Sequence, residues 1–478
     1  MTSVNPYTTK AVKKPSMFFG RAGEMETIRR CLNLPNPRSV IVIGGRKIGK
    51  TSLLYQIRSQ LLQMPEDDGS TLIPVYFDLY ELGSLNMPVF YEHLVKKIVS
   101  SVQQYKDLSI SLPTDLTGDP YQVFLQHMQA IYHQCSVHIA SVKFVFLLDE
   151  MERLLGDNWE SLGKDIASNL RHLINNSGLH SFIALIITGF RGVNDHSMED
   201  IGSMLGNDVT WIRLGVLTET ECRNLITVLL SSEVQEKVVD TVYELSGGHP
   251  FITQHLMQQA WQLDSKNITL VDISHASQQF NDEVSVFISW EQKFEELDIA
   301  IYQALARSEA PVKLGKVREQ VNSDSVKDAL DFLCYTGVVF KQDKKYAIAG
   351  RLFQDWFLQR TSKEQKTMEN SKPSQEADAV KLSSGKKDTT NVRNPWGSGS
   401  FYLTALVVVV LLFLVVAKVV HPVTFSLVVI GAILAISVIG ALQLKQDQQL
   451  NQENFLKLMA LTFRYLPTLI RGKKNNTQ

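Results

Sequence analysis

The segment Gly44–Thr51, with the sequence GGRKIGKT, most constrains what this chain can fold into, because it fits the pattern G-x-x-x-x-G-K-[ST]. An apolar run typical of a strand precedes it at residues 39–43. The helical pattern that follows has apolar residues at Leu53, Leu54, Ile57, Leu61 and Leu62. A glycine-rich loop between a strand and a helix directs main-chain N–H groups and the helix dipole at phosphate. The sequence therefore predicts a nucleoside triphosphate site.

Each position in this loop has an expected role. The glycines let the backbone approach the phosphates, the Lys50 ammonium reaches the β- and γ-phosphates, and the Thr51 hydroxyl ligates Mg²⁺. A chance glycine-rich turn is the alternative, and the strand before the loop and the amphipathic helix after it argue against that. The loop residues predicted to contact the nucleotide are Gly44, Gly45, Arg46, Lys47, Ile48, Gly49, Lys50, Thr51 and Ser52.

Five strand-like runs lie between residues 39 and 214, and helical patterns separate them. This alternation is typical of a parallel sheet that helices cover on both faces. The expected fold class is therefore α/β, with a five-stranded parallel sheet of the ASCE P-loop type. The five runs span residues 39–43, 72–78, 143–148, 182–188 and 209–214.

The third run, Phe144–Leu148, ends in the acidic pair Asp149 and Glu150, as a Walker B strand does. Asp149 would hold the Mg²⁺ shell, and Glu150 would orient and deprotonate the attacking water. Two acids at this position could instead cap the next helix. The loop described above favours the Walker B interpretation.

The fourth run ends in Thr188-Gly189-Phe190-Arg191. Ligands of parallel sheets bind beyond the carboxyl ends of the strands, so a hydroxyl and a guanidinium are expected near the γ-phosphate. Arg191 fits a surface loop equally well. The predicted catalytic residues are Lys50, Glu150, Thr188 and Arg191.

Residues 219–285 have a helical pattern with Thr218 as a predicted N-cap. A Gly-Gly-x-Pro break at residues 247–250 lies inside this region and, on local grounds, predicts a turn. Residues 294–358 then show three helical patterns followed by a short hairpin, which is a winged-helix outline.

The C-terminal part differs in composition from everything before it. Residues 361–400 are polar and predict a disordered tether. Residues 401–444 contain Lys418 as their single charge and form two apolar stretches of about 17 to 20 residues, long enough to cross a membrane as a hairpin. A buried pair of soluble helices is less consistent with stretches that are apolar on every face. Basic flanks place both ends in the cytoplasm, and the basic residues 445–478 suit either a helix on the inner leaflet or a solvated end.

Length and composition narrow the function classes. A chain of 478 residues and 53.9 kDa exceeds one ordinary core, so several folded units are expected. The formal charge of −1 gives no overall nucleic-acid signal. Four widely separated cysteines without a C-x-x-C pair argue against a zinc site or disulfides and suit a reducing cytosol. The polar N-terminus carries no pattern of a secretory signal.

Together, these residues resemble the STAND and archaeal-ATPase branch of AAA+-type P-loop NTPases over residues 17–360. The resemblance rests on Phe18-Phe19-Gly20-Arg21 followed by Glu24, on the two Walker motifs, and on Gly248-His249-Pro250. It implies that Phe19, Gly20 and Arg21 contact the adenine through the backbone and that Pro250 packs on the base. It also implies that the chain binds ATP or ADP with Mg²⁺. The expected domains are a leader at 1–16, an NTPase core at 17–217, a helical lid at 218–288 and a winged helix at 290–360.

Such relatives are slow ATPase switches that stay closed with ADP, and ATP opens them for self-association. This chain has no repeat array after residue 360 and carries the membrane hairpin instead, so the sequence leaves the trigger open. The first hypothesis is a membrane-tethered switch in signalling or defence that forms homo-oligomers with ATP.

The alternative is an ATPase that handles DNA through the winged helix, as origin-recognition relatives do. The expected DNA-reading helix is mainly acidic, with Asp324, Asp328 and Asp331 against Lys327. This charge disfavours contact with phosphate. The short hairpin of the winged-helix outline is basic, however, at Lys341, Lys344 and Lys345. A transporter or protease motor fits less well, because no HExxH or nucleophile motif is present.

Overall fold

The computed structural model describes residues 4–63, 70–114, 116–190, 198–206, 209–230, 235–263, 267–282, 285–308 and 310–370. The described residues all belong to one compact unit, Met1–Pro373. The predicted hairpin at 401–444 and the tail at 445–478 lie outside the described residues, as does the predicted tether beyond residue 370. Across the described ranges, no helix is both long and apolar enough for a membrane span.

The core is one parallel sheet in the strand order β2-β3-β4-β1-β5. All five predicted strands are confirmed with nearly the same bounds. They are β1 (Val40–Gly44), β2 (Thr71–Asp78), β3 (Val142–Asp149), β4 (Ile183–Gly189) and β5 (Thr210–Leu214). Because β1, β3 and β4 run parallel, the loop after β1 opens at the same sheet edge as the ends of β3 and β4.

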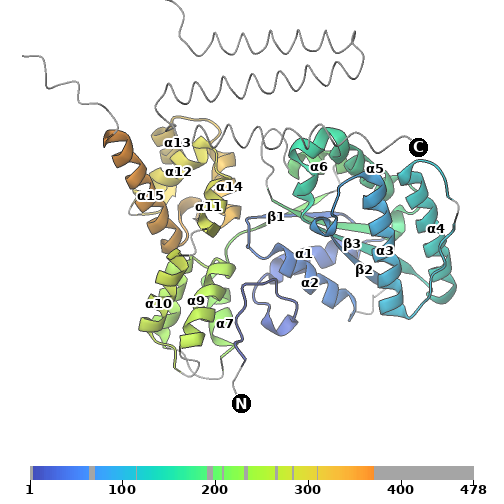
Figure 1. The fold of residues 1–478 in the computed structure, drawn as a ribbon, viewed down its shortest axis with the longest axis horizontal. Helices are drawn as coiled ribbons and strands as arrows, with labels where there is room; N and C mark the ends of the chain where they lie inside the picture. The colour runs from blue at the N-terminus through green and yellow to red at the C-terminus, as the bar shows by residue number, and fades with distance from the viewer. Residues whose placement is uncertain are drawn as a thin grey trace, which may run out of the picture. The chain divides into compact units, whose positions relative to one another are not determined.

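Helices cover both faces of this sheet, which explains why its strands are nearly continuous apolar runs (Figure 1). Along β1, Val40 and Val42 pack on one face, whereas Ile41 and Ile43 pack on the other. The first face is covered by α1 (Ala22–Leu32) and α2 (Lys50–Leu61). The second face is covered by α3 (Met87–Lys106), α4 (Pro120–His138), α5 (Lys164–Asn175) and α6 (Met198–Leu205).

Short helices connect these elements. They are η1 (Pro15–Met17), η2 (Leu79–Glu81), η3 (Met151–Leu154), η4 (Gly156–Asn158), η5 (Trp159–Gly163) and η6 (His180–Phe182). Two of them, η2 and η3, follow β2 and β3 directly, so they lie at the carboxyl edge of the sheet.

A group of helices follows β5 in the region predicted to be a lid, and it is called the lid from here on. It consists of α7 (Glu219–Thr227), α8 (Glu236–Ser246), α9 (Pro250–Leu263) and α10 (Leu270–Asp282). The prediction of Thr218 as an N-cap is confirmed, because Thr218 and Glu221 form a reciprocal capping box. Between α8 and α9, Gly247 and Gly248 have φ of 59° and 74°, so the predicted turn uses a conformation that favours glycine.

The third part combines helices with a small antiparallel sheet of order β6-β8-β7. Its helices are α11 (Ser285–Glu291), α12 (Glu296–Ala306), α13 (Leu314–Val321) and α14 (Val326–Thr336). Its strands are β6 (Val312–Lys313), β7 (Val339–Gln342) and β8 (Lys345–Ile348). The three predicted helices and the hairpin are present at their expected places.

The last described helix, α15 (Arg351–Asn370), corrects one prediction. It continues past Thr361 into the segment predicted to be a disordered tether. That prediction was therefore wrong for residues 361–370. The polar composition suggested disorder, but these residues include good helix formers such as lysine, glutamate and glutamine, and the first proline comes at Pro373. A helix that is already packed at its start can extend through such a sequence.

Candidate functional site

The loop between β1 and α2 presents unpaired main-chain N–H groups at the start of the helix. Gly49 is the N-cap of α2 with φ of 108°, and no side chain caps this end. Within the described part of the chain, the N–H groups of Gly49, Lys50 and Thr51 have no acceptor. Such groups at a helix N-terminus are the usual donors to a phosphate group.

Lys50 is held close to this loop. Its side chain is only 6% exposed, and its ammonium donates to the carbonyls of Gly44 at 3.0 Å and Gly45 at 3.1 Å. The ammonium also lies over the Phe190 ring, 5.9 Å from the ring centre. The positive charge is thus fixed beside the free N–H groups before any ligand binds.

The acidic pair after β3 divides into a buried and a cavity-facing residue. Asp149 is fully buried and accepts hydrogen bonds from the Tyr76 hydroxyl at 3.0 Å, the Glu150 N–H at 3.1 Å and the Thr188 hydroxyl. Thr188 is also fully buried, so its hydroxyl orients Asp149 and does not reach the cavity. Tyr76 was missed by the sequence analysis, since a tyrosine near a strand end carries no motif.

Glu150 lines the cavity and has a left-handed backbone with φ of 57°. Burial raises the pKa of its carboxyl to about 8, and a hydrogen bond and charge repulsion from Glu152 act in the same direction. The nearby Lys50 ammonium opposes this shift. A carboxyl whose pKa lies this close to neutral pH suits a group that exchanges a proton.

Arg21 joins the segment before α1 to both the P-loop and the sheet. Its guanidinium, 6% exposed as a residue, donates to the carbonyls of Gly215 at 2.6 Å and Ile48 at 3.4 Å. Its main-chain N–H donates to the Glu221 carboxylate at 3.0 Å, at the first turn of the lid. Gly20 has φ of 75° and packs against the same carboxylate.

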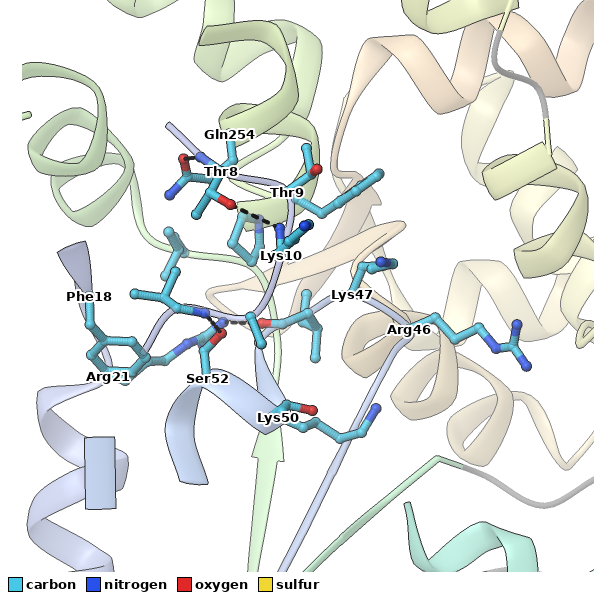
Figure 2. Close-up of a pocket in the computed structure, with 18 of the residues that line it drawn as sticks. Thr8, Thr9, Lys10, Phe18, Arg21, Arg46, Lys47, Lys50, Ser52 and Gln254 are labelled. Atoms are coloured by element: carbon cyan, nitrogen blue, oxygen red, sulfur yellow. Dashed lines mark hydrogen bonds between the residues drawn. The ribbon is translucent and has the colours of Figure 1, made fainter. Parts of the chain in front are cut away.

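Lys50, Glu150 and Arg21 line one cavity of about 480 Å³, a size typical of small-molecule sites (Figure 2). The P-loop forms one side, and Phe18 and Phe19 contribute aromatic surface. The lid contributes Pro250, the first residue of α9, with apolar neighbours. The N-terminal residues 8–12 also line the cavity, which the sequence analysis did not predict.

Most predicted site residues meet at this cavity. Those that line it are Phe19, Arg21, Arg46, Lys47, Ile48, Gly49, Lys50, Thr51, Ser52, Glu150 and Pro250. Those that lie behind its walls are Gly20, Gly44, Gly45, Asp149 and Thr188. Arg191 lies outside the described residues, so its predicted catalytic role stays a prediction.

The C-terminal end of α14 packs directly on the P-loop. The Tyr335 carbonyl accepts a hydrogen bond from the Gly45 N–H at 2.6 Å. A Cβ atom at Gly45 would lie 2.7 Å from the Thr336 Cα, so only glycine fits this approach. The Phe332 ring on the same helix also contacts Phe190, with ring centres 6.0 Å apart. The helix thus touches the phosphate-binding loop and the end of β4.

His249 lies fully buried where the lid, α11 and the end of α14 meet. Its ring packs at a tilt of 33° on Trp290 with centres 4.7 Å apart, and a Cβ atom at Gly337 would lie 2.8 Å from its Cδ2. Neither ring nitrogen makes a hydrogen bond of normal geometry to a described residue, although the Arg46 main chain lies nearby. Burial, followed by the Arg21 charge, lowers the pKa of His249 to about 3.

The buried histidine predicts an acid-sensitive stability. The unfolded chain takes up a proton at His249 below about pH 6.5 and the folded chain does not, so stability is lost as the pH falls below that value. When the pH is lowered from 7.5 to 5.5, the free energy of unfolding should fall in both proteins. We expect the fall to be about 1.4 kcal/mol smaller in His249→Phe than in the wild type. Urea unfolding at both pH values, followed by tryptophan fluorescence, measures this difference.

The exposed His138 provides the matched control. His138→Phe should show the same pH dependence as the wild-type chain. An equal loss of stability in the wild type and in His249→Phe would contradict the expectation.

The sheet order and the positions of the two motifs define the fold of the P-loop ATPases, with the glycine-rich loop after β1 and the acidic pair after β3. Among solved structures, the Walker-type ATPase of Pyrococcus abyssi superposes with a TM-score of 0.52 at 15% identity, over 74% of this chain and 99% of that one. At this identity the likeness concerns the fold.

Two other solved structures match with lower TM-scores. The Orc1 protein of Aeropyrum pernix in complex with DNA gives 0.39 at 13% identity, over 75% of this chain and 96% of that one. A STAND protein with a tetratricopeptide repeat sensor from Pyrococcus horikoshii gives 0.32 at 16% identity, over 76% of this chain and 47% of that one. No protein-family model and no curated protein matches the sequence.

Proposed function

We propose that this protein binds and slowly hydrolyses ATP and uses the bound nucleotide as a conformational switch. The observation that carries the proposal is the set of free N–H groups at Gly49, Lys50 and Thr51, which lies with the Lys50 ammonium at a cavity that Glu150 also lines. The donors suit a polyphosphate, and the aromatic and proline surface suits a base.

The residues fit a magnesium-bound nucleotide. Mg²⁺ beside a phosphate needs one or two protein oxygen ligands. The Thr51 hydroxyl lines the cavity and would supply one of them, and the buried Asp149 carboxylate behind the wall would hold the shell around the ion. Bound Mg²⁺ would neutralise phosphate charge. In the described ranges, no group of three or more His, Cys, Asp or Glu is placed to hold a metal by itself. Glu150 would accept the proton of the attacking water, and Thr188 would hold Asp149 in position.

The switch part of the proposal rests on the contact between α14 and the P-loop. We infer that residues 290–360 are a winged helix, because three helices and an antiparallel hairpin follow each other there. The Tyr335 carbonyl on the Gly45 N–H couples this unit to the phosphate-binding loop. A ligand that prefers one position of the loop will also bias the position of the winged helix.

The membrane part of the proposal rests on sequence alone. The apolar stretches within residues 401–444 support a hairpin, and the basic flanks support a cytoplasmic location for the ATPase and both ends. ATP-driven self-association of the compact unit would then gather hairpins in the membrane. This arrangement suits signalling or defence.

The oligomeric state tests this proposal. The full chain in detergent, analysed by size exclusion with light scattering, should at least double its protein mass when ADP is replaced by a non-hydrolysable ATP analogue. Lys50→Ala should keep the mass of the ADP form under both conditions. An unchanged wild-type mass would count against a clustering switch.

DNA handling is the second candidate. The basic residues Lys341, Lys344 and Lys345 of the β7–β8 hairpin favour it. Against it, Asp328 is exposed on α14 and the C-terminal end of that helix packs on the P-loop. Fluorescence anisotropy with duplex DNA at several salt concentrations distinguishes the two. Weak binding is expected, whereas tight binding that falls steeply with salt would favour the DNA function.

A further inference from the structure

The N-terminal residues 5–14, here called the N-terminal strap, connect the lid to the helix that follows the P-loop. At the lid, Tyr7 is 2% exposed and its hydroxyl donates to the Ile226 carbonyl at 2.5 Å. The Asn5 amide donates to the Gln258 carbonyl at 2.9 Å, and the Gln258 amide donates to the Tyr7 carbonyl at 3.3 Å. A segment that the sequence analysis treated as a leader is thus anchored in the lid core.

The other end of the strap is attached to α2. The Val12 N–H donates to the Ser52 hydroxyl at 2.9 Å, and the Gln56 amide donates to the Val12 carbonyl at 3.2 Å. The Lys13 ammonium lies over the Tyr55 ring, 5.3 Å from its centre. Ser52 directly follows Thr51, so this attachment lies at the phosphate-binding end of the helix.

Between its two attachments, the strap forms part of the cavity wall. Residues 8–12 line the cavity, and the Thr8 N–H donates to the Gln254 side chain of α9 at 3.0 Å (Figure 2). The main-chain N–H groups of Thr9 and Ala11 have no acceptor in the described structure. The strap therefore lines the cavity while both of its ends are fixed.

We propose that the N-terminal strap covers the nucleotide bound in this cavity and sets the rate at which the nucleotide leaves. The inference rests on the proposed nucleotide function. A ligand between the P-loop and residues 8–12 is enclosed as long as the strap stays attached to both the lid and α2. Release then requires the strap to lift off the lid, and the buried Tyr7 is the residue that holds it there.

The dissociation rate of a fluorescent ADP tests the inference. The labelled ADP is bound to the full-length protein in detergent and chased with excess unlabelled ADP in a stopped-flow instrument. Tyr7→Ala removes a buried ring and should accelerate release by about 10- to 100-fold. Tyr7→Phe keeps the ring and loses only the hydrogen bond to Ile226, so release should be faster by about 5-fold.

The controls separate the strap from the fold and from nucleotide binding itself. Val4 directly precedes the strap and is 89% exposed, so Val4→Ala should release ADP at the wild-type rate. If Tyr7→Ala does not fold, the ADP release rate of Tyr7→Phe alone tests the inference. Wild-type rates in both Tyr7 variants would overturn the strap inference alone. Failure of the wild-type chain to bind the labelled ADP would overturn the nucleotide function and the strap inference with it.

Discussion

Lys50→Ala is expected to weaken the binding of both ATP and ADP by about 100-fold or more, which corresponds to about 2.7 kcal/mol or more. The reason is geometric as well as electrostatic. The Lys50 ammonium is already fixed on the Gly44 and Gly45 carbonyls, so it meets the phosphates with little further ordering. Without it, the cavity loses the ammonium that lies beside the free N–H groups of the loop.

Isothermal titration of the full chain with each nucleotide measures this effect. Lys96, an exposed lysine of α3 paired with Glu92, provides a matched control, and Lys96→Ala should bind as the wild type does. Near-wild-type affinity in Lys50→Ala would show that the loop is not the phosphate site.

Glu150→Gln is expected to behave differently, because it should retain ATP binding and lose hydrolysis. A general base contributes typically about 10²- to 10⁴-fold to a rate, so phosphate release should fall by that factor. Glutamine keeps the size of the side chain and cannot accept the proton of water. The variant should therefore accumulate in the ATP-bound state and show the larger mass in light scattering.

Phosphate release and ATP affinity are measured on the same preparation. Glu160 is an exposed glutamate paired with Lys164, and Glu160→Gln should leave both quantities unchanged. Equal loss of ATP binding in Lys50→Ala and Glu150→Gln would contradict the separate roles of these two residues.

The sheet and its two motifs could be predicted because their signals are local. Strands buried on both faces are apolar throughout, so the apolar runs mark their ends in the sequence. The expected bounds of β3 and β4 are therefore close to those observed. The loop at Gly44–Thr51 and the acid pair after β3 each follow a strand, so the parallel order brings them to one edge. The Thr218 cap was predictable for the same reason, since its partner Glu221 is three residues away.

The contacts that connect the parts of the compact unit could not be predicted. Tyr7 meets Ile226, and Tyr335 meets Gly45, across long stretches of chain, and neither pair forms a periodic pattern. Tyr76 supports Asp149 only because β2 and β3 are neighbours in register. The polar composition after residue 360 also led to a wrong prediction of disorder, because α15 continues through residue 370.

The burial of His249 has a consequence for how firmly α14 stays on the P-loop. A buried polar group without a hydrogen bond costs about 1 to 3 kcal/mol, and in water both of its ring nitrogens would be solvated. The docked arrangement is therefore weaker than a purely apolar contact of the same size. A ligand therefore needs a smaller difference in affinity between the two positions to release the helix from the loop.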